Sequence, residues 1–124
     1  MKRVLIADDE PIERMIVTRT IQKYFPEELA VVSAVNGREA VEQFFAENCQ
    51  IALLDIEMPG MNGLEAAEQI RERDKNCSII FLTAFDEFNY AKRAIAVRAM
   101  EYLLKPVEDQ ELEAVLAEAI RIAD

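Results

Sequence analysis

The chain has 124 residues, a hydrophobic share of 52% and a formal net charge of −10. Its length suits one domain with its own core, and its apolar runs are too short to cross a membrane. The acidic balance argues against direct nucleic-acid binding, which draws most of its affinity from cations that neutralise phosphates. The N-terminus does not resemble a signal peptide, because acids interrupt its apolar run. We therefore expect a soluble, cytoplasmic protein of one domain, residues 1–124, with no membrane contact.

Five apolar runs alternate with five stripes of apolar residues at helical spacing. In chain order the pairs are Val4–Ala7 and Ile12–Tyr24, Val31–Val35 and Ala40–Phe45, Ile51–Leu54 and Leu64–Ile70, Ile79–Leu82 and Phe88–Ile95, and Tyr102–Leu104 and Leu112–Ile120. The runs are continuous rather than alternating, which is typical of strands buried on both faces of a parallel sheet. The alternation predicts an α/β fold with helices on both faces of that sheet.

Local signals support the helix starts. Pro11 can occupy the first turn of the first helix. Asn36-Gly37 and Asn62-Gly63 are turn dipeptides that precede the second and third helices, and Asp86 is the expected N-cap of the fourth. These signals place the loops at the same points as the apolar pattern does.

Polar side chains follow four of the five predicted strands. Asp8, Asp9 and Glu10 follow the first, Asp55 the third, Thr83 the fourth and Lys105 the fifth, whereas only the turn Asn36-Gly37 follows the second. In open α/β sheets the ligand site lies beyond the carboxyl ends of the strands. We therefore expect these polar groups to meet at one edge of the sheet.

The residue types at this edge predict a metal-assisted phosphoryl site. Three crowded carboxylates repel one another, and a bound cation relieves that repulsion. Mg²⁺ prefers oxygen ligands, commonly carboxylates together with water and phosphate oxygens. Asp55 is the central carboxylate and therefore the expected nucleophile, since carboxylates form aspartyl phosphates. Lys105 would add a second cation for the phosphoryl oxygens, and Thr83 a hydrogen bond.

Each of these residues, taken singly, has an ordinary structural explanation. An aspartate after a strand is commonly a turn former or a helix cap. Thr83 could simply end its strand, and Lys105 could be an exposed lysine. Only their joint placement at one edge favours a metal site over these explanations.

Four stretches of the chain resemble the receiver domain of two-component response regulators. They are VLIADDE at 4–10, LLDIEMPGMNG at 53–63, LTA at 82–84 and YLLKP at 102–106, in the order and spacing of that family. The resemblance covers the whole chain. It implies a flavodoxin-like (βα)5 fold, in which a doubly wound parallel sheet has the strand order 2-1-3-4-5. It also implies a regulatory domain that catalyses only its own phosphorylation and dephosphorylation.

The resemblance assigns a metal-binding role to the acids. Asp55 is the expected phosphoacceptor and a metal ligand. Asp9 is the expected direct ligand of Mg²⁺, or of Mn²⁺ in its place, and Asp8 would act more through water. The backbone carbonyl of Glu57 is the expected further ligand, so that its side chain need not bind.

The same resemblance assigns the remaining site residues. Thr83, Ala84 and Lys105 are expected to bind the phosphoryl group. Thr83 and Tyr102 resemble the switch pair of the family, although an aromatic residue on a terminal strand is also commonly a packing residue. A cis peptide bond is expected before Pro106.

A partner and an output follow from this resemblance. The donor would be a phosphohistidine of a sensor histidine kinase, because this chain has no histidine, and acetyl phosphate or a similar small donor can substitute. Thr83 would move to bond a phosphoryl oxygen, and Tyr102 would then turn inward. The face made by the fourth helix, fifth strand and fifth helix would form a homodimer or release an output domain.

Residues 83–107 further resemble receivers that are fused to AraC-like helix-turn-helix domains. Contact with DNA would then come only through an output domain absent from this chain, and the output would be transcriptional. One departure is Arg98-Ala99, where many relatives carry a glycine before the alanine. Glycine is favoured at a helix C-terminus, so Arg98 leaves the end of the fourth helix less well defined.

Two other functions remain open on the sequence alone. A metal-dependent phosphatase with an aspartyl nucleophile would use a second acid two residues on, where this chain has Glu57. No cap domain or substrate pocket is evident to support it. A structural interaction module with a vestigial site is the second alternative, and it would not bind Mg²⁺ at millimolar concentration.

The two cysteines have their own pair of interpretations. Cys49 and Cys77 each lie six positions before a site residue, Asp55 and Thr83. On neighbouring strands, which lie about 4.8 Å apart, they would start side by side. Such a pair could be redox-sensitive, but two reduced thiols near a sheet edge are the favoured interpretation, and the sequence suits a reducing compartment.

Overall fold

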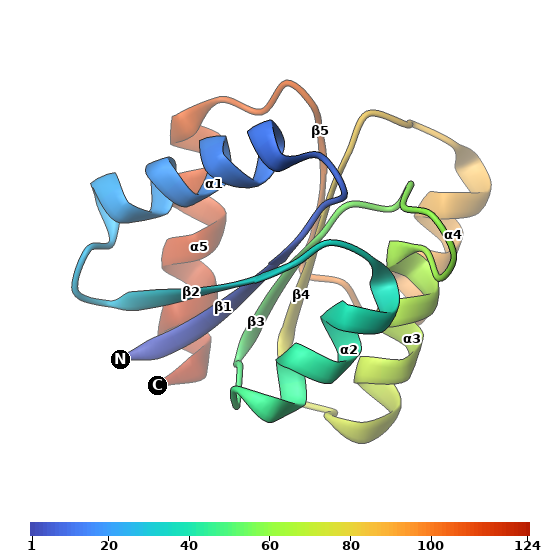
Figure 1. Ribbon diagram of the computed structural model, residues 1–124, viewed down its shortest axis with the longest axis horizontal. Helices are drawn as coiled ribbons and strands as arrows, with labels where there is room; N and C mark the ends of the chain where they lie inside the picture. The colour runs from blue at the N-terminus through green and yellow to red at the C-terminus, as the bar shows by residue number, and fades with distance from the viewer.

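The computed structural model describes all residues, Met1–Asp124, as five strands that alternate with five helices (Figure 1). The elements are β1 Lys2–Ala7, α1 Pro11–Tyr24, β2 Leu29–Ala34, α2 Gly37–Ala46, β3 Ile51–Leu54, α3 Gly63–Arg73, β4 Ser78–Thr83, α4 Phe88–Ala96, β5 Glu101–Leu104 and α5 Asp109–Ala123. The strands form one sheet in the order β2-β1-β3-β4-β5, and every neighbouring pair is parallel. The predicted fold class and strand order are confirmed.

Helices cover both faces of the sheet. Figure 1 shows α1 and α5 on one face and α2, α3 and α4 on the other. One buried core packs the second group against the sheet through residues such as Phe44 and Phe81. A second core packs α1 and α5 through residues such as Ile21 and Leu53. The central strands contribute side chains to both cores, which explains their continuous apolar runs. No helix has the length and apolar composition that a membrane crossing requires.

The register of the sheet brings the polar strand ends to one edge. Ala7 pairs with Leu54 across β1 and β3, and Thr83 pairs with Leu104 across β4 and β5. The chain therefore leaves these strands on the same side of the sheet. The residues at that point are Asp8 after β1, Asp55 after β3 and Lys105 after β5.

Every strand except β3 differs from its predicted limits, and β2 and β4 illustrate the reason. Thr83 is the last residue of β4 rather than the residue after it, because its carbonyl accepts a hydrogen bond of 2.8 Å from the amide of Lys105. β2 begins at Leu29 rather than at Val31, because Leu29 pairs with Lys2 at the start of β1. In both cases a partner strand extends the element beyond its apolar run.

The helix starts follow the sequence signals with one exception. Pro11 lies in the first turn of α1. Asn36 caps α2 by accepting from the amide of Glu39. The prediction that Asp86 caps α4 is wrong, because the N-cap is Glu87, and no side chain bonds the helix start there. Asp86 and Glu87 are adjacent acids that could both precede the helix, so the sequence alone did not determine which of them is the N-cap.

The start of α3 is packed directly against the backbone of Asp55. Asn62 and Glu65 form a capping box at this helix start. A Cβ atom added to Gly63 would lie 2.0 Å from the carbonyl oxygen of Asp55, so only glycine fits at this close approach. The amide of Gly63 also donates to the carbonyl of Ile56 at 2.9 Å. These contacts fix the position from which the Asp55 side chain projects.

The end of α4 has left-handed backbone at a residue with a side chain. Arg98 has φ 56°, and the amides of Arg98 and Ala99 donate to the carbonyls of Ile95 and Ala94. This bonding is the Schellman arrangement, which most often carries glycine at the left-handed position. α4 thus ends with arginine at a position where the backbone favours glycine.

Candidate functional site

Three carboxylates converge beyond the ends of β1 and β3. Asp8 and Asp55 are buried and Asp9 is exposed, and one oxygen from each lies within 4.8 Å of the other two. The sheet holds the buried pair in place, because the amide of Asp55 donates to the carbonyl of Ala7 at 2.9 Å. The structure thus brings together the three acids that the sequence predicted to meet.

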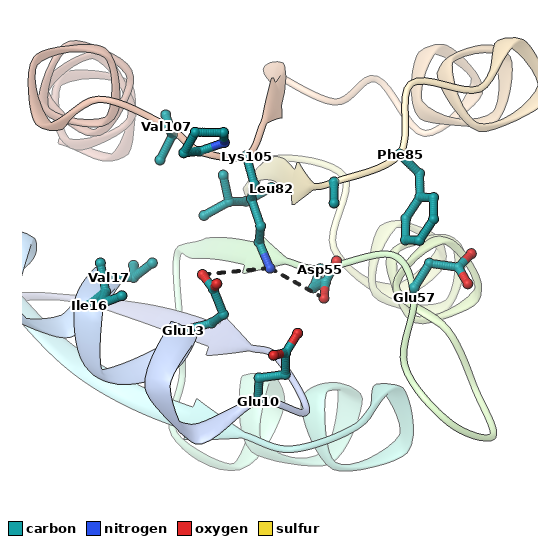
Figure 2. A pocket seen from close by; sticks show the side chains of 12 residues that line it. Glu10, Glu13, Ile16, Val17, Asp55, Glu57, Leu82, Phe85, Lys105 and Val107 are labelled. Atoms are coloured by element: carbon teal, nitrogen blue, oxygen red, sulfur yellow. Dashed lines mark ion pairs between the residues drawn. The ribbon is translucent and has the colours of Figure 1, made fainter.

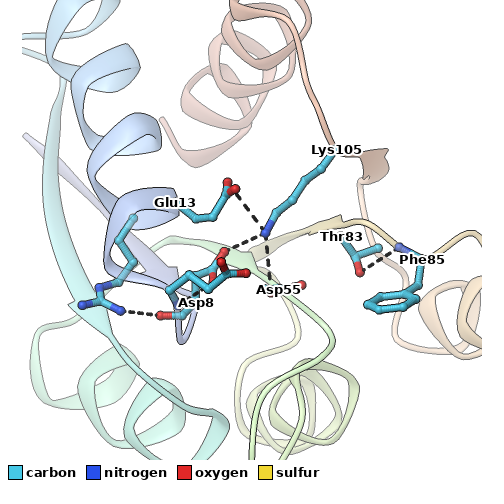
Figure 3. A network of polar contacts seen from close by, with 8 residues as sticks. Asp8, Glu13, Asp55, Thr83, Phe85 and Lys105 are labelled. Atoms are coloured by element: carbon cyan, nitrogen blue, oxygen red, sulfur yellow. Dashed lines mark hydrogen bonds and ion pairs between the residues drawn. The ribbon is translucent and has the colours of Figure 1, made fainter.

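Lys105 reaches into this cluster from the end of β5. Its Nζ lies 2.8 Å from Oδ2 of Asp8, 3.5 Å from Oδ2 of Asp55 and 3.9 Å from Oε2 of Glu13 (Figures 2 and 3). The peptide bond between Lys105 and Pro106 is cis, at the position where a cis bond was expected. Burial alone would lower the pKa of Lys105, but the hydrogen bond to Asp8 and the neighbouring carboxylates outweigh it and raise that pKa. Lys105 is therefore a cation held among acids.

Burial opposes the charge of Asp55. The loss of hydration raises its pKa from 3.8 to about 6, the ammonium of Lys105 acts in the opposite direction, and the carboxylate of Asp8 adds to the rise. A carboxylate in this position gains from any further cation placed beside it. The electrostatics therefore favour a bound cation.

The two aspartates that follow β1 differ in their contacts. Oδ1 of Asp8 accepts from the amide of Glu10 at 3.0 Å, and Oδ2 accepts from Lys105. The guanidinium of Arg14 donates to the carbonyl of Asp8 at 2.6 Å. Asp9 is exposed, and its carboxylate makes neither a hydrogen bond nor an ion pair. Both oxygens of Asp9 are therefore available to a ligand.

The donor set fits a hard divalent cation. Three carboxylates with oxygens in mutual reach match the oxygen ligands of Mg²⁺. Three negative charges and the ammonium of Lys105 leave two negative charges, which one divalent ion would cancel. Asp8, Asp9 and Asp55 are the residues that would hold it.

The cluster opens into a cavity of about 460 Å³. Its polar lining includes Glu10, Glu13, Asp55, Glu57 and Lys105, and its apolar lining includes Leu82, Phe85 and Val107 (Figure 2). Ala84, a predicted phosphoryl-binding residue, also lines this cavity. A small anionic group can thus reach Asp55 from solvent between α1 and the β4–α4 loop.

Thr83 and Tyr102 both form hydrogen bonds with the backbone of Phe85. The buried Thr83 hydroxyl accepts from the amide of Phe85 at 3.3 Å (Figure 3). The Tyr102 hydroxyl donates to the carbonyl of Phe85, and its ring packs near Phe81 with 6.3 Å between the centroids. Neither hydroxyl contacts Asp55 here. The two residues are linked through the backbone of Phe85.

Four residues at or near the site were not predicted from the sequence. Glu13 and Arg14 lie in the first turn of α1, and helical spacing from the buried Val17 could have placed them beside Asp8. Phe85, which contacts Thr83 and Tyr102, and Tyr90, whose hydroxyl donates to the carboxylate of Glu57, make contacts between distant parts of the chain, for which the sequence carries no local signal.

Comparison with known proteins points to one family. Residues 4–117 match the response regulator receiver domain. The chain is 41% identical over 118 residues to the positive alginate biosynthesis regulatory protein of Pseudomonas aeruginosa, covering 95% of this chain and 47% of that protein. It is 34% identical over 120 residues to the uncharacterized transcriptional regulatory protein YesN of Bacillus subtilis, covering 97% of this chain and 33% of that protein. The chain thus spans less than half the length of these curated relatives.

A solved structure agrees with this match. The response regulator protein TrrA of Thermotoga maritima, crystallised in complex with Mg²⁺ and BeF, superposes with a TM-score of 0.85 at 38% sequence identity. The match covers 96% of this chain and 99% of that one. The similarity therefore extends over the whole sheet, including the edge that carries the acids.

Proposed function

The chain belongs to the response regulator receiver domain family, and from this premise we propose that it is a phosphorylation-dependent switch whose phosphoacceptor is Asp55. Mg²⁺, or Mn²⁺ in its place, would bind at Asp8, Asp9 and Asp55, with the backbone carbonyl of Glu57 as a further ligand. The relative TrrA was crystallised with Mg²⁺ and BeF, which supports the choice of metal.

One observation carries the proposal. The Asp55 carboxylate is buried, faces two other carboxylates and lies 3.5 Å from the ammonium of Lys105. This arrangement would neutralise charge around a nucleophilic oxygen while keeping most water away from it. An acid that served only as a turn former would not need a buried cation beside it.

The reaction would be an in-line transfer of a phosphoryl group. An Asp55 carboxylate oxygen would bond to phosphorus as the bond from phosphorus to the donor breaks, with the electron pair leaving on the donor atom. Lys105 would bind the phosphoryl oxygens, and Ala84, which lines the same cavity, would add a hydrogen bond from its amide. The bound divalent ion would supply positive charge to the carboxylate and phosphoryl oxygens. The free carboxylate of Asp9 is suited to direct ligation, and the engaged carboxylate of Asp8 to contact through water.

The donor would come from a partner, because this chain contains no histidine. A phosphohistidine of a sensor histidine kinase is the donor class that two-component receivers use. The cavity beside Asp55 offers room for such a group to approach. Acetyl phosphate would serve as a small substitute.

The switch would pass through Phe85. Phosphorylation adds about −1.5 to −2 charges and strong acceptor oxygens. Thr83 would turn its hydroxyl to donate to one of these oxygens and so release the amide of Phe85. Tyr102, which bonds the carbonyl of the same residue, would then change its position and turn inward. The β4–α4 loop would thus carry the change to the face formed by α4, β5 and α5.

That face is suited to a partner or an output domain. Phe88 and Ile95 are exposed on α4, at 82% and 77% of their surface, and Leu104 of β5 is 42% exposed. We infer that the face forms a homodimer after phosphorylation. A transcriptional output is supported by the names of the alginate regulator and YesN, and an AraC-like DNA-binding domain is the form that we propose for it.

The assignment of Asp55 can be tested with beryllofluoride, which mimics a phosphoryl group on a carboxylate. With Mg²⁺ present, we expect it to shift the amide NMR signals of Thr83, Phe85 and Tyr102 in the wild-type protein. The Asp55→Asn variant should show no such shift, because it offers no charged oxygen. Equal responses of the two proteins would sink the assignment. Steady release of phosphate from a phosphate monoester would instead favour the phosphatase alternative. Absence of Mg²⁺ binding would favour an interaction module with a vestigial site.

A further inference from the structure

A fourth carboxylate lies at the wall of the acid cluster without joining it. Glu57 is exposed, follows Asp55 by two positions and lines the same cavity (Figure 2). Its carboxylate accepts a hydrogen bond from the hydroxyl of Tyr90 in α4, and Figure 2 shows it pointing away from Asp55. The acids that converge are the other three, Asp8, Asp9 and Asp55. The carboxylate of Glu57 is thus engaged by the Tyr90 hydroxyl rather than by the acid cluster.

The position of Tyr90 is fixed by the attachment of α4 to α3. The buried guanidinium of Arg71, in α3, donates to the carbonyl of Val97 at 2.8 Å. Arg93, one turn beyond Tyr90, pairs with Glu68 of α3 at 2.9 Å. The second pair is exposed and contributes little on its own, but both contacts hold α4 against α3. From α4, the Tyr90 hydroxyl reaches Glu57 in the loop that leads from β3 into α3.

We propose that Tyr90 determines the metal specificity of the site by holding the Glu57 carboxylate out of the coordination shell. This inference rests on the proposed function, since it needs the metal site at the three aspartates. Ca²⁺ takes roughly six to eight oxygen ligands and accepts bidentate carboxylates, whereas Mg²⁺ needs near-octahedral geometry and keeps several waters. A released Glu57 would add ligand oxygens and charge, which favours Ca²⁺ over Mg²⁺.

The same contact keeps the charge of the site suited to a phosphoryl donor. The three aspartates and Lys105 leave two negative charges, which one divalent ion cancels. The carboxylate of Glu57 beside the ion would add a further negative charge facing an incoming anion, and the two would repel. Holding Glu57 at Tyr90 therefore keeps coordination positions open and keeps one more negative charge away from the incoming anion.

The test is a comparison of metal affinities in the Tyr90→Phe variant, which loses the hydroxyl and keeps the ring. Titration of the ¹⁵N-labelled protein with MgCl₂ or CaCl₂, followed by the amide signals of Asp9 and Asp55, gives both dissociation constants. We expect the affinity for Ca²⁺ relative to Mg²⁺ to rise by about three- to tenfold over wild type. Melting curves of each variant verify that it is folded.

Two further variants separate the explanations. Tyr24→Phe removes a hydroxyl at the last residue of α1, outside the site, and should keep the wild-type ratio. Adding Glu57→Gln to Tyr90→Phe removes the released charge and should return the ratio to the wild-type value. An unchanged ratio in Tyr90→Phe, or a gain that persists in the double variant, overturns the proposal. Absence of Asp55-dependent Mg²⁺ binding in the wild type would instead overturn the proposed function.

Discussion

Asp55 is a buried acid whose surroundings oppose its charge. Burial raises its pKa to about 6, against an ordinary value of 3.8. The folded state therefore binds a proton at Asp55 more readily than the unfolded state does. Ionisation of Asp55 above about pH 6 destabilises the metal-free protein, and below about pH 4 both states carry the proton. The proposed nucleophile is thus ionised at neutral pH at a cost in stability.

We expect Asp55→Asn to raise the free energy of unfolding of the metal-free protein by about 1–3 kcal/mol at pH 7. Asparagine keeps the size of the side chain and removes the buried charge. The gain should shrink as the pH falls from about 6 toward 4, because the wild-type carboxyl becomes neutral over this range. Urea unfolding followed by circular dichroism, with a chelator present, would measure it.

A control for the loss of one negative charge is Glu42→Gln, at an exposed position of α2. This variant should show no comparable gain, and its stability difference should not follow the same pH profile. If the Asp55→Asn protein were less stable than wild type at neutral pH, the buried charge of Asp55 would not be destabilising and the prediction would be wrong.

The sequence predicted the acid cluster because each member directly follows a strand of a parallel sheet. The placement of Asp8, Asp55 and Lys105 followed from the rule that the carboxyl ends of parallel strands share one edge of the sheet. The contact of Tyr90 with Glu57 had no such rule, since it depends on how α4 packs against α3. The same holds for Phe85, whose backbone joins Thr83 to Tyr102 only in the folded chain.

Among the secondary-structure elements, α4 has the least favourable end. Left-handed backbone costs roughly 1–2 kcal/mol for residues other than glycine, and Arg98 adopts it with φ 56°. Its side chain gives little in return, because its one hydrogen bond is to the carbonyl of Lys75 at 3.5 Å. The carbonyls at this helix end are bonded by Arg71, which does not depend on the identity of residue 98.

Arg98→Gly should therefore raise the free energy of unfolding by about 0.5–1 kcal/mol. The relief of the strained backbone exceeds the added entropy that glycine brings to the unfolded chain. Arg98→Ala is the matched control, because it removes the side chain but keeps the strain, and it should show no gain. Urea unfolding compares the three proteins, and equal stability of the two variants would contradict the explanation.

Element boundaries were predictable where a side chain itself supplies the signal. Pro11, Asn36 and Asn62 mark helix starts that the structure keeps. The limits of β2 and β4 were not, because hydrogen bonds to Lys2 and Lys105 extend these strands past their apolar runs. Such bonds belong to the partner strand and leave no local trace.

At the scale of the whole molecule, the βα rhythm predicted a parallel sheet covered on both faces. It did not predict which strands are neighbours, since several arrangements satisfy the same periodicity. The order 2-1-3-4-5 came from the resemblance to receiver domains. The proposed dimer face is likewise a property of the assembled molecule, because it joins α4, β5 and α5, which follow one another in the chain but pack on different parts of the sheet.

We expect Mg²⁺ and beryllofluoride to increase the dimer fraction of the wild-type protein in sedimentation velocity. Ile95→Asp should remain monomeric, because it places a charge on an apolar residue that is 77% exposed on α4. Ile12→Asp, at a 65% exposed position of α1 on the opposite layer, should dimerise as the wild type does. If Ile95→Asp dimerised equally well, the face formed by α4, β5 and α5 would not be the interface.

Two glycines near the site, Gly37 and Gly63, mark the side of the site where the backbone is packed too tightly to move. An added Cβ would lie 2.0 Å from the carbonyl oxygen of Asp55 at Gly63 and 2.3 Å from that of Met61 at Gly37, so the starts of α2 and α3 are in direct contact with the loop that follows β3. Polar bonds that can exchange partners hold Thr83, Tyr102 and Tyr90 on the other side. Extra volume on Asp55 would therefore be taken up toward β4, β5 and α4. The absence of a Cβ at Gly37 and Gly63 thus determines that a structural change starting at Asp55 spreads toward α4 rather than toward α3.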